Sequence, residues 1–262
     1  MNTLNETNAT VEENNLEEAY QTYRLLKEEI KEWQEERGSF WLQNLKITEA
    51  PPYYPLANLP ADAIFELWVR LNRVMEEEVS DSDLKDAWQN LKAGRGIQKA
   101  WLQSTLQLAL SGLAQLVRIM LNSRFEDNIQ FRNSISEHEH ESEENQNRCC
   151  PICGEKAVLS VLIPPHGKRF LHCIFCGQEW PVMRTGCILC GRDEASSQNY
   201  LRAKEYPGVE LVTCESCGQF FKEFDLRLLT AEDLVWEDVR TLPLNYAGEH
   251  WVADHRTSVK TQ

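Results

Sequence analysis

The feature that most constrains this chain is a set of four Cys-x-x-Cys-Gly motifs in its second half. Eight of the nine cysteines form the pairs Cys150/Cys153, Cys173/Cys176, Cys187/Cys190 and Cys214/Cys217, and a glycine follows each pair. In a metal-binding knuckle the chain turns tightly after the second sulfur, and glycine suits that turn because it tolerates positive φ. The motifs therefore predict four metal-binding knuckles.

The spacing of the pairs predicts how the knuckles combine. The arrangements C-x2-C-x19-C-x2-C (Cys150 to Cys176) and C-x2-C-x23-C-x2-C (Cys187 to Cys217) both fall near zinc-ribbon or rubredoxin spacing. We expect two tetrahedral four-cysteine sites and two metal ions per chain, with Cys150, Cys153, Cys173 and Cys176 as one ligand set and Cys187, Cys190, Cys214 and Cys217 as the other. An alternative joins the two middle pairs in one site and the two outer pairs in another. Iron and zinc both accept four thiolates, so spacing does not separate them.

Two other uses of the cysteines are a disulfide framework and a redox dithiol. Met1–Asn15 is polar and acidic and lacks the features of an export signal, so we expect a cytoplasmic protein whose thiols stay reduced. A redox CxxC normally occurs once, at the start of a helix, and does not need the following glycine. Cys149 has no pair partner and is interpreted as a spare reduced thiol.

Several residues near the cysteines could support the sites. Four thiolates around a divalent ion carry a charge of −2, which nearby cations could offset. His172 could act as an outer hydrogen-bond donor or compete as a ligand, and Trp180 is interpreted as the apolar lid of a ribbon. The candidate counter-ions are Lys156, Lys168, Arg169, Arg184 and Arg192.

Charge and motif content argue against two common classes of function. The net charge is −14, and residues 1–148 hold 15 Lys and Arg against 26 Asp and Glu, so neither half offers the basic surface that nucleic acid requires. The chain contains no P-loop, Rossmann, GxSxG or HExxH motif, which disfavours the commonest enzyme classes. We expect a protein that is not an enzyme and binds no nucleic acid.

The first half of the chain has the periodicity of helices. Apolar residues recur at helical spacing over 16–33, 61–79, 84–91 and 100–121, which predicts an antiparallel bundle within residues 12–122. Gly38 is interpreted as the end of the first helix, and the SDSD sequence from Ser80 as the N-cap of the third. A polar stripe from Gln103 to Gln115 marks the last helix as a core helix rather than a membrane span.

The second half indicates short strands, in AVLSVLI (157–163), KRFLHC (168–173) and ELVTC (210–214), and a closing helix from Ala231 to about Leu242. Residues 127–148 are too polar to order themselves, and Glu137–Glu141 is interpreted as a solvated hinge rather than a metal site. We therefore expect a multidomain α+β chain. Its predicted parts are a helical N-terminal domain (1–123), an acidic flexible linker (124–148), a first four-cysteine rubredoxin-like module (149–185) and a second such module with a C-terminal helix (186–262).

These motifs resemble the FdhE family of formate dehydrogenase accessory proteins. The resemblance rests on the CPxCG knuckle at Cys150–Gly154, a basic-aromatic-Leu-His-Cys run at Arg169–Cys176, Trp180 and Arg184 before Cys187 and Cys190, and Thr213–Cys217 followed by Phe221 and Lys222. The sequence DLVWEDVRTLPLNYAGEHW stands where the family has an amphipathic helix. The helical first half agrees only in being helical.

The resemblance implies a cytoplasmic assembly factor with two rubredoxin-like, iron-binding sites. It also implies that the protein binds the catalytic molybdenum- or tungsten-containing subunit of formate dehydrogenase during maturation. The residues alone leave two other functions open. One is a rubredoxin-like redox or electron-transfer protein, and the other is a zinc-ribbon protein that binds nucleic acid.

Overall fold

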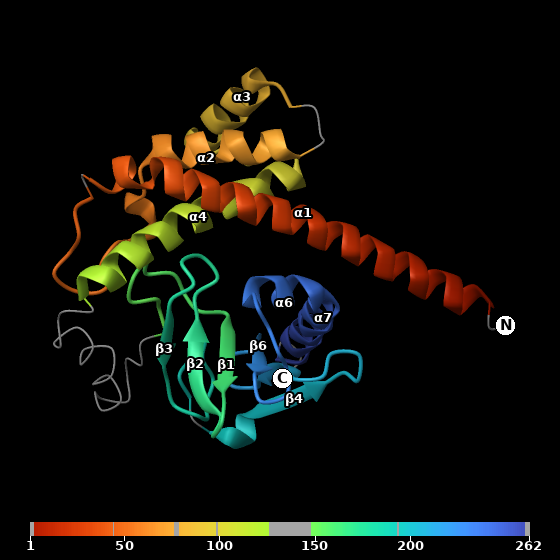
Figure 1. Ribbon diagram of the computed structural model, residues 1–262. Coiled ribbons are helices and arrows are strands. Elements are labelled where there is room, and N and C mark those ends of the chain that lie inside the picture. Colours follow the sequence, from red (N-terminus) through yellow and green to blue (C-terminus); the bar gives the residue numbers. More distant parts are fainter. Residues whose placement is uncertain are drawn as a thin grey trace. The chain divides into compact units, whose positions relative to one another are not determined.

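A computed structural model describes residues 3–43, 45–75, 79–97, 99–125, 148–192 and 194–259. It has a helical region followed by a region that contains one β-sheet and two four-cysteine clusters, so the predicted α+β class is confirmed (Figure 1). The chain divides into two compact units. The first combines Met1–Ile47 with Leu56–Val117, and the second combines Thr48–Pro55 with Arg118–Gln262. Residues 126–147, which hold most of the predicted linker and all of Glu137–Glu141, lie outside the described residues.

The first unit is built from helices, as the apolar periodicity predicts. The helices are α1 (Thr3–Leu42), the 3-10 helix η1 (Leu56–Asn58), α2 (Ala61–Val74), α3 (Asp81–Lys92) and α4 (Ala100–Phe125). The predicted N-cap of α3 is confirmed, because Ser80 and Asp83 form a reciprocal capping box in which each side chain bonds the other residue's backbone N–H.

Gly38 does not end the first helix, so that prediction is wrong. The glycine lies inside α1, and a Cβ at this position would come within 3.1 Å of the Leu116 side chain of α4. The missing side chain therefore allows two helices to approach closely. The core around them contains Trp33 and Trp68, both fully buried, and Trp68 donates its indole N–H to the Leu102 carbonyl at 3.1 Å.

The helix α4 is long and apolar enough to cross a membrane by length and composition alone. Half of its apolar stretch is nevertheless buried inside the protein. Ala109 and Leu113 are almost completely inaccessible, and a side chain at Gly112 would collide with Ile30 of α1. The helix α4 therefore packs as a core helix, as its polar stripe predicts.

The second unit contains a six-stranded sheet in the order β3-β2-β1-β6-β5-β4. Its strands are β1 (Leu159–Ile163), β2 (Lys168–His172), β3 (Glu179–Pro181), β4 (Gln198–Arg202), β5 (Val209–Cys214) and β6 (Gln219–Asp225). Neighbouring strands are antiparallel except β1 and β6, which are parallel with Leu159 opposite Lys222. This parallel pair joins the strands around the first two cysteine motifs to those around the last two.

Two C-terminal helices pack on this sheet. The predicted single closing helix is α6 (Leu234–Arg240) followed, after Thr241, by α7 (Leu242–Val259). Leu244 of α7 shares a buried cluster with Leu159, Val209 and Phe224 from three strands. Lys222 of β6 is buried and its ammonium lies 2.8 Å from the Asp238 carboxylate, which ties α6 to the same face.

Candidate metal centres

The first candidate centre, site I, consists of Cys150, Cys153, Cys173 and Cys176. The Sγ atoms of Cys150 and Cys176 lie 3.4 Å apart, as do those of Cys153 and Cys173. All four side chains are buried, and all four sulfur atoms lie within 4.8 Å of one another. A disulfide bond would require about 2.05 Å, and all nine cysteines of the chain are free thiols. Site I is therefore a compact cluster of four unbonded sulfurs.

The second candidate centre, site II, consists of Cys187, Cys190, Cys214 and Cys217. The sulfurs of Cys187 and Cys217 are 3.8 Å apart, and those of Cys190 and Cys214 are 3.9 Å apart. A tetrahedral ion with metal–sulfur bonds of about 2.3 Å places its ligands about 3.8 Å apart. These two separations in site II match those around a zinc or iron ion, and the two in site I are a few tenths of an ångström shorter.

The cysteines are grouped as their spacing predicts. Sites I and II each combine two consecutive CxxC pairs, so the structure does not have the alternative in which the two middle pairs share one site. The two clusters could each hold one metal ion. Site I is wholly buried, whereas Cys190 and Cys217 leave site II partly exposed.

Each knuckle has the same backbone geometry. The glycine after each pair donates its N–H to the carbonyl of the first cysteine, at 2.8 to 2.9 Å. The φ angles of these glycines are positive, between 62° and 82°, which L-amino acids with a side chain rarely adopt. The sequence folds this way because two residues separate the sulfurs and a residue without Cβ completes the turn. The four glycines are Gly154, Gly177, Gly191 and Gly218.

Without a cation, the clustered thiols do not all ionise. Burial raises the pKa of the Cys187 thiol to about 11. In site I, hydrogen bonds among the sulfurs, together with burial, raise the pKa of Cys150 and Cys176, while hydrogen bonds from its neighbours lower the pKa of Cys173. The negative charge is thus favoured at Cys173 and disfavoured at Cys150 and Cys176. A divalent cation removes this competition, because it stabilises every coordinated thiolate.

Two guanidinium groups that the sequence did not single out lie against the knuckles. A Cβ at Gly177 would be 3.9 Å from Arg118 Nε, and one at Gly191 would be 3.6 Å from the Arg148 guanidinium carbon. Arg148 also donates to the carbonyl of Leu189 at 2.8 Å, inside the third CxxC motif. Both arginines are remote in sequence from the knuckle they contact, so motif spacing could not reveal them.

Of the five candidate counter-ions predicted from the sequence, one is paired with a carboxylate and four are exposed. Arg169 is buried and its guanidinium lies 2.8 Å from the Glu223 carboxylate, so its charge is already compensated. Arg184 is exposed at the edge of a cavity described below. Lys156, Lys168 and Arg192 are also exposed.

The other candidates near the metal sites are His172, Trp180 and Cys149. His172 Nδ1 lies 3.0 Å from the Glu179 carboxylate, and His172 is in neither metal cluster, so its place agrees with an outer role. Trp180 is buried, as expected for an apolar lid. Cys149 is exposed, forms a β-bridge with Lys156 and lies outside both clusters.

The connection between α1 and α2 also supports site I, which the sequence did not indicate. The backbone N–H groups of Tyr53 and Tyr54 donate to the carbonyls of Pro151 and Ile152, at 2.9 and 2.8 Å. These carbonyls belong to the first CxxC motif. Both tyrosines are buried, and Pro52 packs against Gly154. A segment about a hundred residues earlier thus covers the first knuckle.

Comparison with known proteins finds one consistent set of relatives. Residues 149–184 match the FdhE central domain. A protein described as an FdhE homolog from Aquifex aeolicus is 36% identical over 101 residues, which are 37% of this chain and 35% of the relative. Another, from Shewanella oneidensis, is 32% identical over 102 residues, or 38% and 33% of the two chains. The aligned part of this chain thus spans about a third of the length of these relatives.

The similarity in fold extends further along the chain. The crystal structure of the FdhE protein from Pseudomonas aeruginosa superposes with a TM-score of 0.50. The superposition covers 84% of this chain and 75% of the other, at 18% sequence identity.

Proposed function

Because residues 149–184 match the FdhE central domain and the fold resembles that of an FdhE crystal structure, we propose that this chain is an FdhE-family protein and a formate dehydrogenase accessory protein. It acts in the cytoplasm, binds the catalytic molybdenum- or tungsten-containing subunit while that enzyme matures, and is not itself an enzyme. The observation that carries the proposal is the pair of four-cysteine clusters, the first of which lies within the segment that matches the FdhE central domain.

We propose the eight clustered cysteines as the ligands of two metal ions per chain, iron or zinc. Zinc would fix the knuckle loops, whereas iron would in addition accept an electron. The chain's own contribution is to hold the thiols together. Glycine turns aim each CxxC pair inward, the Tyr53–Tyr54 segment covers site I, and β1 and β6 fix the two sites to one sheet.

The experiment that tests the proposal is recovery of the catalytic subunit from the host cell on the tagged chain. We expect the wild-type chain to retain that subunit. Changing Cys150 and Cys153 together to Ser should abolish retention and lower formate dehydrogenase activity in cells that lack the natural copy. Cys149→Ser is the matched control, since this neighbouring thiol is exposed and outside both clusters. Equal retention and activity with both variants would refute a role for site I in binding the client.

One observation favours a second candidate function, electron transfer. Cys190 and Cys217 are partly exposed, whereas the cysteines of site I are buried. An iron ion at site II would thus lie close to solvent, where a redox partner could reach it. Reversible bleaching of a visible charge-transfer band by dithionite would support this function, provided that Cys190→Ser removes the part of the band that bleaches and Cys153→Ser leaves that part. A colourless zinc protein with full client binding would exclude it.

A further inference from the structure

A cavity of about 680 Å³ lies in the second unit, and neither metal site uses it. This volume is in the range of pockets that bind small molecules or peptide side chains. The glutamates of the cavity lie on the face of the sheet opposite the apolar cluster under α7, because Glu210 and Glu223 alternate along their strands with the buried Val209 and Phe224. Ala203, Tyr206 and Val209 connect the cavity to that cluster at the end of the sheet. We call it the Arg184 cavity. It is lined by Leu162, Arg184, Tyr200, Arg202, Ala203, Tyr206, Pro207, Gly208, Val209, Glu210, Glu223, Asp225, Arg227 and Leu228.

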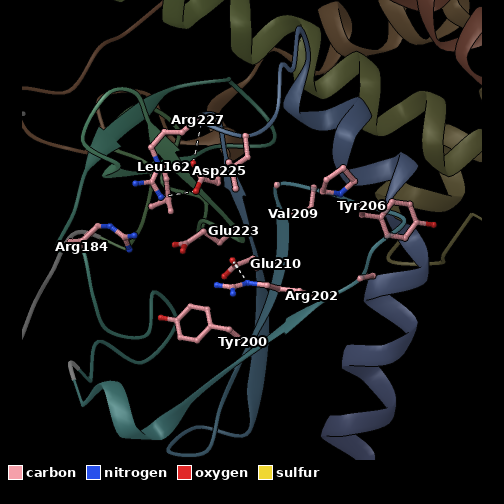
Figure 2. A pocket seen from close by; sticks show the side chains of 14 residues that line it. Leu162, Arg184, Tyr200, Arg202, Tyr206, Val209, Glu210, Glu223, Asp225 and Arg227 are labelled. Atoms are coloured by element: carbon pink, nitrogen blue, oxygen red, sulfur yellow. Dashed lines mark hydrogen bonds and ion pairs between the residues drawn. The ribbon is translucent and has the colours of Figure 1, made fainter.

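Each carboxylate in the lining already has an arginine. Arg202 Nε lies 2.6 Å from Glu210, and Arg227 lies 2.6 Å from Asp225. Glu223 is buried against Arg169 at 2.8 Å and also accepts a hydrogen bond from Ser160 at 2.6 Å. Two of these pairs are drawn as dashed lines in Figure 2. The acidic groups of the cavity are thereby neutralised from within the protein.

Arg184 is the arginine in the lining that is not paired with a carboxylate. In the part of the chain that the structure describes, its guanidinium makes no hydrogen bond and no ion pair, and it is exposed. Figure 2 shows its side chain directed into the cavity, toward the side on which Glu223 lies. The lining holds three arginines and three carboxylates, but Glu223 is paired with Arg169, which does not line the cavity, so Arg184 is left without a carboxylate of its own. A planar guanidinium binds a carboxylate through two parallel hydrogen bonds, so the charge complement is an anionic carboxylate.

Two exposed side chains with large apolar surfaces line the same cavity. Tyr200 and Leu228 are 41% and 72% exposed. Exposed apolar groups around one arginine are typical of the energetic centre of a protein–protein interface. Six lining residues, including Tyr200 and Arg202, belong to β4 or the turn after it, at the edge of the sheet, where a partner segment has access.

From these observations we propose that the Arg184 cavity binds a peptide segment of the client that presents an acidic side chain next to a large apolar one. The carboxylate pairs with Arg184, and the apolar neighbour packs on Tyr200 and Leu228. This inference deepens the proposed function, on which it rests. It assigns recognition to the Arg184 cavity, and it makes the metal sites the support of the sheet that forms this cavity.

The test uses the full-length holoprotein and an array of end-blocked, overlapping twelve-residue peptides from the formate dehydrogenase catalytic subunit. We expect binding peptides to contain Asp or Glu beside a large apolar residue. Replacing that acid by its amide should weaken binding about tenfold, the effect of losing roughly 1.4 kcal/mol. Arg184→Gln should weaken binding equally and abolish the difference between acid and amide. Leu228→Ser tests the apolar contact independently.

Lys204→Gln is the matched control, because this exposed lysine lies in the same turn as Ala203 but does not line the cavity. It should bind the peptides as the wild type does. Binding that is the same for Arg184→Gln, binding of basic peptides in place of acidic ones, or no peptide binding by the wild type would each overturn the inference. In those cases retention of the whole catalytic subunit still supports the accessory role, whereas loss of that retention removes the proposed function itself.

Discussion

The Arg169 guanidinium lies 2.8 Å from the Glu223 carboxylate, and both side chains are almost fully buried. Arg169 stands on β2, between the first two cysteine motifs, and Glu223 stands on β6, beyond the fourth. Arg169 also donates to the carbonyl of Gly186 at 2.7 Å, directly before Cys187 of site II. One buried arginine therefore links the strands around site I to the loop that begins site II.

This link gives a prediction for stability. Arg169→Met should destabilise the sheet by about 3 to 5 kcal/mol, because it leaves the buried Glu223 carboxylate without its cation. The double change to Met at both positions should recover most of the loss. Native-state hydrogen exchange of β1 and β6 amides measures the effect locally. Arg202→Met is the control, since Arg202 is 74% exposed and such pairs contribute less than about 1 kcal/mol. Equal effects of Arg169→Met and Arg202→Met would contradict this assignment.

The knuckle glycines give a prediction for metal retention. Gly177 has φ of +68°, and the nearest atoms to an added Cβ would be 3.9 Å away, so alanine there is strained by its backbone conformation alone. The strain of about 1 kcal/mol should speed metal release to a chelator about fivefold. Gly96→Ala, where the backbone is not left-handed and no atom lies within 4 Å, should not change release. Release that is unaffected by Gly177→Ala would show that the turn does not need glycine.

The helical unit gives a prediction for pH dependence. Burial acts to raise the pKa of Glu66, but hydrogen bonds from Arg37 and Trp33, both at 2.8 Å, leave it below its usual value. A carboxylate whose folded pKa is depressed contributes stability above its unfolded pKa of about 4.3, and this contribution is lost as the pH falls through the folded value.

Glu66→Gln should therefore cost about 1 kcal/mol near neutral pH, and the two proteins should converge in stability below about pH 4. Urea denaturation followed by far-ultraviolet circular dichroism measures the difference. Loss of metal from the cysteine sites in acid affects both proteins alike and cancels. A difference that stays constant from neutral to acidic pH would show that the Glu66 charge does not contribute.

Local sequence signals predicted the parts of the molecule that depend on neighbouring residues. The two-residue gap in each CxxC, the following glycine and the distance to the next pair were enough to group the sulfurs correctly. The capping box at Ser80 and Asp83 was likewise visible, because both partners lie within one turn. Gly38 was misread because a glycine can either end a helix or let a second helix approach, and only tertiary contacts separate these roles.

Non-local contacts could not be predicted in the same way. The parallel pairing of β1 with β6 connects residues about sixty positions apart, and no spacing rule announces it. The same holds for Tyr53 and Tyr54 on the first knuckle, and for Arg118 beside Gly177. Arg184 was singled out as a counter-ion of thiolates. Its place in a cavity depends on strands and turns that are distant from it in sequence, so motif spacing could not predict it.

The most direct test of the account is the metal content of the chain purified without oxygen. Two ions of iron or zinc per chain are expected for the wild type and for Cys149→Ser. One ion is expected for Cys153→Ser, which opens site I, and for Cys190→Ser, which opens site II. A wild-type chain without metal, or single variants that still hold two ions, would contradict the central claim that these eight cysteines form two independent metal centres.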